Sequence, residues 1–325
     1  PAARPRTNLW PRLGLLQAVV MLIAVVVALP VAFRSMGTLL IDGQARTLHV
    51  FPSGEPLTGP ADESLAEVEN FFNIAAIDLD EEQGSITLAI SGHRNCADAC
   101  ATINFTLVSL DDDADVRRAL PPSAPLTLTA EEAIFSQTVQ LPIRGQPSQY
   151  PFDDYLLWLG LTGTVDQEGE TVPLTVEMLA DRAVITTQNQ TRDYIMAPPV
   201  AIDPARVTTV TDPQDFLGVQ ALRFERPVHQ EILAVLLIAL IAVSAVMAVA
   251  LRTMSDLLIG VGSLILGIWG VRSVLVPSSL SVVSAIDLAL SVIILFVLLG
   301  LSLRAARHFQ QQSALPPVSL RRRRG

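Results

Sequence analysis

One histidine and two cysteines are the side chains best suited to metal or redox chemistry. His93, Cys96 and Cys100 fall within eight residues, after a segment in which polar and apolar residues alternate. Cysteine and histidine at such spacing can ligate zinc or copper, but no fourth ligand lies nearby. Outside the cytoplasm the thiols oxidise, and the short loop closes if the two Cα atoms come within about 7 Å. We predict a Cys96–Cys100 disulfide, with free thiols and a metal site as alternatives.

Two acidic runs, at residues 78–82 and 111–115, have the composition of calcium loops. Neither fits the EF-hand pattern, which needs Gly at loop position six and Glu at position twelve. We expect solvated turns, with calcium binding as the alternative. A nucleophile elbow, an HExxH helix, a phosphate-binding glycine loop and an SxxK pair are all absent from the sequence. The sequence therefore predicts no enzyme, no cofactor and no resident metal.

The composition indicates that part of the chain lies in lipid. Half of the 325 residues are hydrophobic and 17% are charged, whereas soluble domains are about one quarter charged. The net charge of −10 excludes nucleic acid as a partner, because phosphate binding needs a basic surface.

Four apolar runs are long enough to cross a bilayer, since about 20 helical residues span a hydrocarbon core of about 30 Å. They cover residues 13–33, 229–251, 257–276 and 285–303. The first run is longer than the apolar region of a cleaved signal peptide, and Arg34 stands where a cleavage site would lie. We expect an uncleaved signal anchor, with a cleaved signal as the alternative.

Arginine placement predicts the orientation, because cytoplasmic flanks carry the excess of positive charge. Arginines precede the first run, lie between the second and third, and follow the fourth. Residues 1–12 and 304–325 are therefore expected in the cytoplasm and residues 34–228 outside, in a multi-pass plasma-membrane protein. Arg272 is the exception; its side chain can extend outward, and we predict that it pairs with Asp287.

Residues 34–228 carry the chain's surplus of acidic residues, and their hydrophobic pattern mostly has period two. Short alternating segments separated by Pro, Gly and Asp clusters are typical of an antiparallel β-sandwich. The predicted strands cover residues 85–90, 102–107, 133–141, 155–161, 172–179, 183–187 and 217–224. One short helix is expected over residues 63–72. The predicted fold class is thus a mixed membrane protein, with four transmembrane helices and an antiparallel β-sandwich-like extracytoplasmic domain.

A proline between two aromatic residues, in Tyr150-Pro151-Phe152-Asp153, predicts a rigid loop that buries its rings. Asp153 would cap this loop by accepting backbone N–H groups. We hypothesise that the loop couples the outer domain to the membrane near Arg272 and Pro277. An ordinary structural turn far from the bilayer is the alternative.

Two resemblances arise at particular residues. The segment Tyr150–Tyr155, the turn Arg272–Pro277 and the following Ile286-Asp287 resemble the bacterial membrane-protein family called domain of unknown function 4436. That resemblance implies one N-terminal span, a β-rich outer domain, three C-terminal spans and no particular activity.

Pieces of the chain are also similar to pentameric ligand-gated channels. The matching pieces are Tyr150–Asp153, Arg226-Pro227, Arg272, Pro277-Ser278 and Ala285–Asp287. The chain departs from that family in its extra N-terminal span, its missing fourth channel helix and its loop without flanking cysteines. The third apolar run has Ser263 at its middle but lacks the row of hydroxyl groups that a pore-lining helix has.

The expected function is a non-catalytic binding or assembly role at the plasma membrane. The expected partners are the lipid bilayer and either another protein or further copies of this chain. The alternative is a subunit of an oligomeric channel or receptor.

Overall fold

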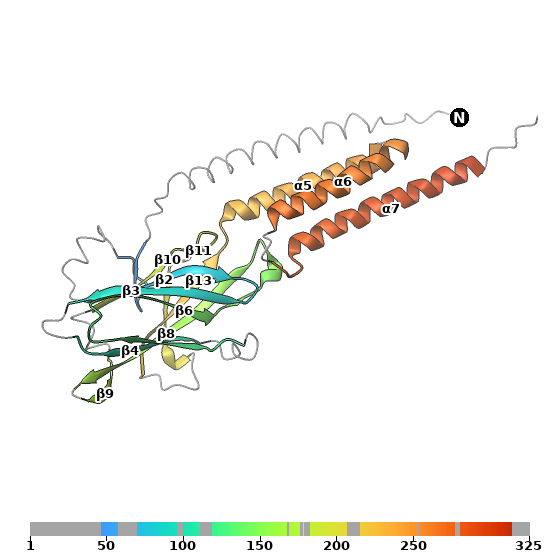
Figure 1. Cartoon of the computed structure of the whole chain (residues 1–325). Coiled ribbons are helices and arrows are strands. Elements are labelled where there is room, and N and C mark those ends of the chain that lie inside the picture. Colours follow the sequence, from blue (N-terminus) through green and yellow to red (C-terminus); the bar gives the residue numbers. More distant parts are fainter. Residues whose placement is uncertain are drawn as a thin grey trace, which may run out of the picture. The chain divides into compact units, whose positions relative to one another are not determined.

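The computed structural model describes residues 47–57, 70–95, 100–110, 119–167, 169–175, 178, 183–206, 215–251, 254–276 and 280–313 (Figure 1). The chain is divided into two compact units. The β-rich unit, here called the β-domain, extends through Gln230, and a helical unit begins at Glu231.

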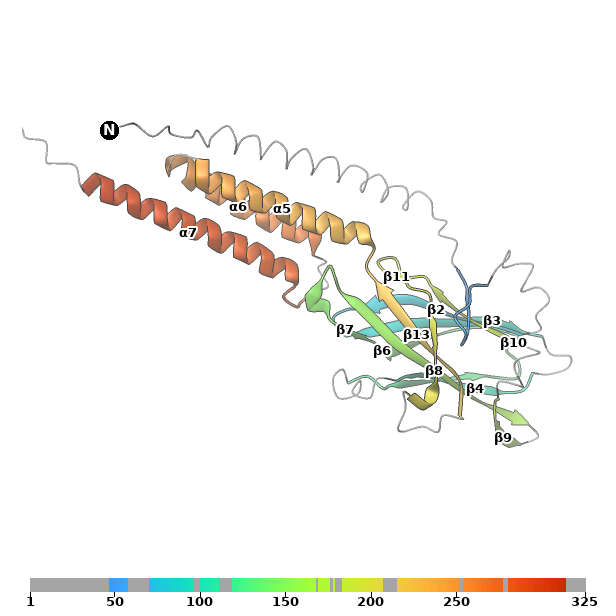
Figure 2. The same ribbon diagram turned by 180° about the vertical axis from the view of Figure 1, so that it is seen from behind.

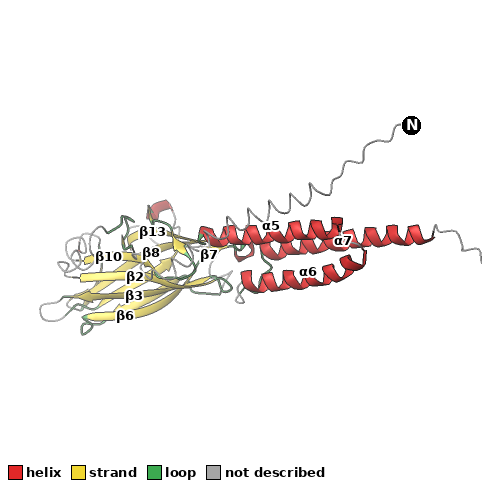
Figure 3. Cartoon of the chain, turned by 90° about the horizontal axis from the view of Figure 1, so that it is seen from above, coloured by secondary structure: helices red, strands yellow, loops and turns green. Residues whose placement is uncertain are grey.

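The β-domain contains two sheets. The strands of the first sheet, in spatial order, are β1 (His49–Val50), β10 (Ala183–Asn189), β2 (Asn70–Asp80), β3 (Ser85–Arg94) and β6 (Ile134–Pro142). Figure 3 shows β10, β2, β3 and β6 in this order. The second sheet follows the order β11 (Ile195–Met196), β13 (Phe216–Glu225), β8 (Asp154–Gln167), β4 (Ile103–Ser109) and β5 (Ser123–Leu128). Three short strands extend it, with β12 (Val200–Ile202) on β13, and β7 (Arg144–Gly145) and β9 (Glu170–Pro173) on β8. Two 3-10 turns, η1 (Pro147–Gln149) and η2 (Pro204–Arg206), complete the domain.

The core lies between the two sheets. Alternate residues of β3 and β4 point inward, so that Leu88 and Leu107 are almost completely buried. Phe72 of the first sheet meets Phe105 of the second edge to face, with ring centroids 5.3 Å apart. Period-two alternation therefore predicted β3, β4, β6, β8, β10 and β13 correctly.

The first sheet is mixed, which corrects the antiparallel prediction. Strands β10 and β2 run parallel, with Ala183 opposite Asn70 and Asn189 opposite Ala76. Parallel strands are usually buried on both faces and so lack alternation, and β2 has an unbroken buried stretch in its middle. The helix predicted over residues 63–72 is wrong at its end, because residues 70–72 begin β2; residues 63–69 lie outside the described residues.

The described residues after the β-strands form three helices, α5 (Val228–Leu251), α6 (Met254–Leu275) and α7 (Ala285–Ser313) (Figure 2). The first turn of α5, through Gln230, belongs to the β-rich unit, and the rest of α5 belongs to the helical unit. Helices α5 and α7 contact each other closely at Gly300, where an added Cβ would lie 2.6 Å from a methyl group of Val249. Near this contact Arg304 Nη2 donates a hydrogen bond of 2.9 Å to the Ala250 carbonyl.

Two helices are long and apolar enough to cross a membrane, over Val228–Ala250 and Ala285–Gln310. The prediction of four transmembrane helices is not met. A further apolar stretch, Ile259–Leu275, lies within α6. The predicted span at residues 13–33 lies outside the described residues. Helix α7 extends ten residues past the predicted end at residue 303.

Candidate functional site

A buried arginine lies directly after the last strand of the β-domain. Arg226 binds both carboxylate oxygens of Asp153, with Nε 3.0 Å from Oδ1 and Nη2 3.1 Å from Oδ2. The side chains of Arg226 and Asp153 are 3% and 0% exposed. Two parallel charge-assisted hydrogen bonds fix both the distance and the plane of a guanidinium group.

A second carboxylate, from the turn between β2 and β3, shares this guanidinium. Arg226 Nη2 also donates to Glu81 Oε1, and the same oxygen accepts the hydroxyl proton of Tyr194. Glu81 Oε2 and the Tyr155 hydroxyl have no hydrogen-bond partner among the described residues. Two carboxylates therefore face one guanidinium in the interior.

Tyrosine rings enclose the guanidinium on two sides. Arg226 Cζ lies 4.5 Å from the ring centroid of Tyr150 and 4.5 Å from that of Tyr194, which are cation–π distances. The Tyr155 ring packs edge to face against Tyr194, with centroids 5.4 Å apart. We call Glu81, Tyr150, Asp153, Tyr155, Tyr194 and Arg226 the arginine cluster.

Local structure explains how each segment reaches the cluster. Asp154 of β8 is paired with Glu225 of β13, so the next residue outward on each strand, Asp153 and Arg226, face each other. In the β2–β3 turn the Gln83 N–H donates to Asp80 Oδ1 at 2.8 Å. Gly84 closes the turn with a φ of 60°, a conformation that glycine adopts without strain.

Burial and charge act in opposite directions on these groups. Burial disfavours the charge of Arg226, but the hydrogen bond with Asp153 and the nearby charges outweigh burial and raise its pKa. The pKa of Tyr194 is raised, chiefly by burial, although the charge of Arg226 opposes this. Burial likewise raises the pKa values of Tyr150 and Tyr155. The arginine stays charged and the tyrosines stay protonated at neutral pH.

The structure alters two predictions for the loop at residues 150–153. Tyr150 is buried as predicted, but the Phe152 side chain is 50% exposed, so the prediction that both rings are buried is wrong. Asp153 is buried, yet its carboxylate accepts hydrogen bonds from a distant guanidinium and not from the loop backbone. Asp153 therefore pairs with Arg226, and does not cap the loop as predicted.

Sequence reasoning missed Glu81 and the role of Arg226. Glu81 belongs to the acidic run at residues 78–82, which was expected to be solvated; Glu81 is only 9% exposed. The signal that could have found the pair is an arginine just before an apolar helix in a domain rich in acidic residues. The second acidic run, at residues 111–115, lies outside the described residues.

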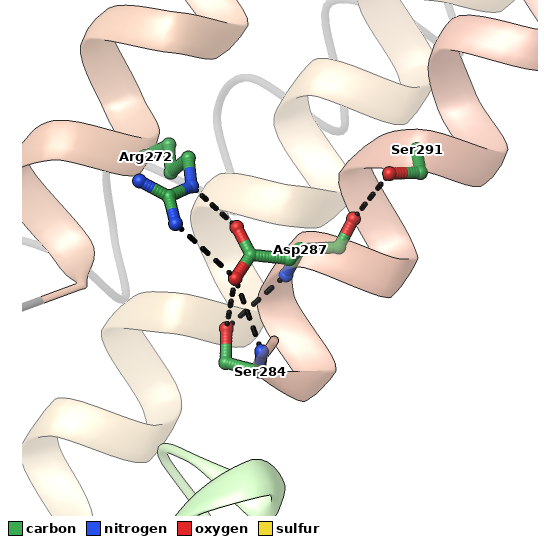
Figure 4. Close-up of polar contacts among 4 residues, drawn as sticks. All are labelled: Arg272, Ser284, Asp287 and Ser291. Carbon is green, nitrogen blue, oxygen red and sulfur yellow. Dashed lines mark hydrogen bonds and ion pairs between the residues drawn. The ribbon is translucent and has the colours of Figure 1, made fainter. Parts of the chain in front are cut away.

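A second polar group joins α6 to α7 (Figure 4). Arg272 Nε donates to Asp287 Oδ1 at 2.5 Å, as the predicted pairing requires. Asp287 Oδ2 accepts 3.0 Å hydrogen bonds from both the N–H and the hydroxyl of Ser284, and the Ser284 hydroxyl accepts from the Asp287 N–H at 3.3 Å. This reciprocal exchange is a capping box at the start of α7, which the sequence analysis overlooked. Pro277 lies outside the described residues, and the coupling role stays a prediction.

The cysteine region is described only in part. Cys100 is disulfide-bonded, whereas Cys96 lies outside the described residues, so the pairing of these two residues stays a prediction. The ring of His93, the third residue of the proposed metal alternative, lies 6.0 Å from the ring of Phe71.

The fold and the cluster define a class: a mostly β sandwich that continues, two residues after a buried arginine, into an apolar helix. Residues 59–194 match the family model described as Domain of unknown function (DUF4436), which supports the predicted resemblance to that family. The matched residues include five of the six cluster residues and end before Arg226. No curated protein matches the chain. The resemblance to pentameric ligand-gated channels gains no support from these comparisons.

Proposed function

We propose that the protein is a plasma-membrane protein whose acidic β-domain faces the outside and acts by binding or assembly, without catalysis. The apolar helices α5 and α7 support the membrane assignment. The distribution of arginine supports the orientation, with both ends of the chain in the cytoplasm.

The arginine cluster is the observation that carries this proposal. Arg226 lies two residues before α5, and its contacts join β13 to the β2–β3 turn and to the loop before β8. The Arg226 guanidinium is enclosed by carboxylates and rings and is almost fully buried, so its role is to hold these segments together. Such contacts stabilise the end of the β-domain that is joined to α5, as a domain needs when it binds a partner while it is anchored in a membrane.

Labelling of single cysteines on intact cells tests the orientation. In a background with Cys96→Ser and Cys100→Ser, Ser136→Cys on β6 and Gln310→Cys on α7 both place a thiol at an exposed position. A membrane-impermeant maleimide should label position 136 on intact cells and position 310 only after permeabilisation. Labelling of position 310 from outside would overturn the orientation.

Assembly into an oligomer is favoured by one face of α6. Gly262 and Gly270 lie two turns apart, and no described atom lies within 4 Å of the Cβ that either would carry. Small residues at such positions allow helices to approach closely in membranes. The mass of the complex in mild detergent tests this: a defined oligomer supports assembly, a ring of five would favour the channel alternative, and a monomer contradicts both.

A further inference from the structure

Three exposed apolar side chains directly flank the arginine cluster. Phe152 is 50% exposed and precedes Asp153, Ile195 is 47% exposed and follows Tyr194, and Val228 is 63% exposed. Ile195 is paired with Glu225 on β13, so it lies beside the residue that precedes Arg226. We call Phe152, Ile195 and Val228 the apolar tip.

The chain itself places this tip at the beginning of α5. Two residues span at most about 7 Å, so Val228 lies within that distance of Arg226, whose side chain binds Asp153 directly. The first turn of α5, through Gln230, belongs to the compact unit of the β-domain. The tip and the start of the helix therefore belong to one end of one unit.

The start of α5 has the composition of a headgroup region. After Val228 the helix carries His229, Gln230 and Glu231, and an uninterrupted apolar run follows from Ile232. The candidate span has 23 residues, about 34 Å of helix, which exceeds a hydrocarbon core of about 30 Å. The first turn of the helix thus lies at the level of the headgroups.

We propose that the apolar tip docks into the outer interface of the lipid bilayer, with Phe152 and Ile195 in contact with lipid. This inference rests on the proposed membrane location. An aromatic or branched side chain is favourable at the boundary between headgroups and acyl chains. Exposed charges surround the tip: Arg223 Nη2 lies 2.9 Å from Asp154 Oδ2, and Arg223 Nε 3.1 Å from Glu225 Oε1. These groups remain with the polar headgroups while the tip contacts lipid.

The opposite end of the β-domain provides a matched control. Ile134 is 83% exposed and is paired with His93, whereas Ser85 at the other end of β3 follows the turn that carries Glu81. At about 3.3 Å per residue, the eight residue steps from Ser85 to His93 span about 26 Å. Ile134 is thus an equally apolar, exposed residue far from the tip.

Nitroxide labels on single cysteines test the proposal in the full-length chain. Phe152→Cys, Ile195→Cys, Ile134→Cys and Val246→Cys are made in the Cys96→Ser/Cys100→Ser background, labelled and reconstituted into phosphatidylcholine vesicles. Collision rates with oxygen, which concentrates in lipid, and with a polar nickel complex report each label's surroundings. Val246 is 45% exposed within α5 and tests the membrane location itself.

The expected ratio of oxygen to nickel collisions is highest at position 246, several-fold above water at positions 152 and 195, and equal to that of water at position 134. If position 246 behaves as in water, the membrane location fails. If position 246 lies in lipid while position 152 matches position 134, only the docking proposal fails. A label at position 152 shielded from both reagents would also overturn it, because that side chain would then pack against protein, as the coupling hypothesis for Arg272–Pro277 requires. The label at position 195 decides the matter if Phe152→Cys does not fold.

Discussion

Two buried arginines among the described residues of the β-domain, Arg94 and Arg226, lie at opposite ends and bind different kinds of groups. Arg94 and Arg226 are each 4% exposed. Arg94 binds neutral backbone oxygens: its Nε and Nη2 donate to the Glu132 carbonyl at 3.1 and 2.7 Å, and its Nη1 donates to the Ala101 carbonyl at 2.8 Å. Its Nη2 also donates to the Thr129 carbonyl. Arg226 instead binds two carboxylates.

The different partners shift the pKa values of Arg94 and Arg226 in opposite directions. Burial lowers the pKa of Arg94, and the charge of Glu132 only partly opposes it, whereas the carboxylates around Arg226 outweigh burial and raise its pKa. Arg94 fastens loops with hydrogen bonds, but Arg226 is one member of a set of opposite charges. The arginine cluster, with its opposite charges, lies at the end where the chain enters α5. Arg94, with its neutral carbonyl partners, lies at the other end.

Removal of Arg226 should have the largest effect. Arg226→Met leaves two buried carboxylates without their partner, and such a change typically costs about 3–5 kcal/mol of unfolding free energy. Chemical unfolding of the full chain in detergent, followed by β-sheet circular dichroism, measures this. The control is Arg223→Met, which breaks ion pairs that are about half exposed and should cost below about 1 kcal/mol. Equal losses of unfolding free energy in the two variants would contradict the stabilising role assigned to Arg226.

Alkaline pH should weaken the arginine-cluster end strongly. The chain contains three tyrosines, all in the cluster, and their pKa values are raised in the folded state. A raised pKa gives stability that is complete below the unfolded value of about 10 and is lost as pH rises above it. Each tyrosine then contributes a fall of up to about 1.4 kcal/mol per pH unit.

Absorbance at the tyrosinate band checks this directly, because the ionised phenol absorbs there and the neutral phenol does not. The chain has no lysine, so lysine titration does not add to the loss of stability in the same pH range. We expect no ionisation of the folded protein near pH 10, followed by ionisation of all three tyrosines together when the domain unfolds. Titration near pH 10 without unfolding would show that the rings are accessible to water.

Removal of Arg94 should cost less than removal of Arg226. Arg94→Met leaves the carbonyls of Ala101, Thr129 and Glu132 without this donor, but it leaves no buried charge. Unsatisfied neutral acceptors cost about 1–3 kcal/mol. The same unfolding experiment compares the two variants, and a loss as large as that of Arg226→Met would remove the distinction between the two ends.

Removal of a single hydroxyl group tests one hydrogen bond of the arginine cluster. Tyr194→Phe keeps the ring over the guanidinium and removes the hydrogen bond to Glu81; bonds to charged groups contribute about 1.5–3 kcal/mol. Tyr155→Phe is the matched comparison: its hydroxyl has no partner in strict hydrogen-bond geometry among the described residues and interacts weakly with Asp153, so its loss should cost less than the loss of the Tyr194 hydroxyl. If Tyr155→Phe proves the more damaging of the two, the assigned hydrogen bond is wrong.

The sequence was sufficient where structure depends on neighbouring residues. Alternation identified strands with one buried face, such as β3 and β4, and charge with spacing predicted the Arg272–Asp287 pair across a short turn. It failed at β2, whose Phe72 and Ile74 belong to an apolar stretch without alternation.

The arginine cluster could not be predicted because its parts are remote in sequence. Arg226 is separated from Asp153 by 73 positions and from Glu81 by 145. Glu81 lies among other acidic residues of the run at 78–82, so no local pattern shows that its carboxylate is the buried one of that run. Short-range rules predict that Asp153 caps its own loop. The pairing of β8 with β13 instead brings Arg226 to its carboxylate.

The central claim is that the cluster is one balanced ionic unit, and the unfolding free energy of a triple variant tests it most directly. Arg226→Met alone leaves Glu81 and Asp153 charged and unpaired in the interior. Arg226→Met combined with Glu81→Gln and Asp153→Asn removes those charges, and replacing a whole buried ionic group is far less harmful than breaking it. We predict that the triple variant regains most of the stability lost by Arg226→Met. A triple variant less stable than Arg226→Met would contradict the claim.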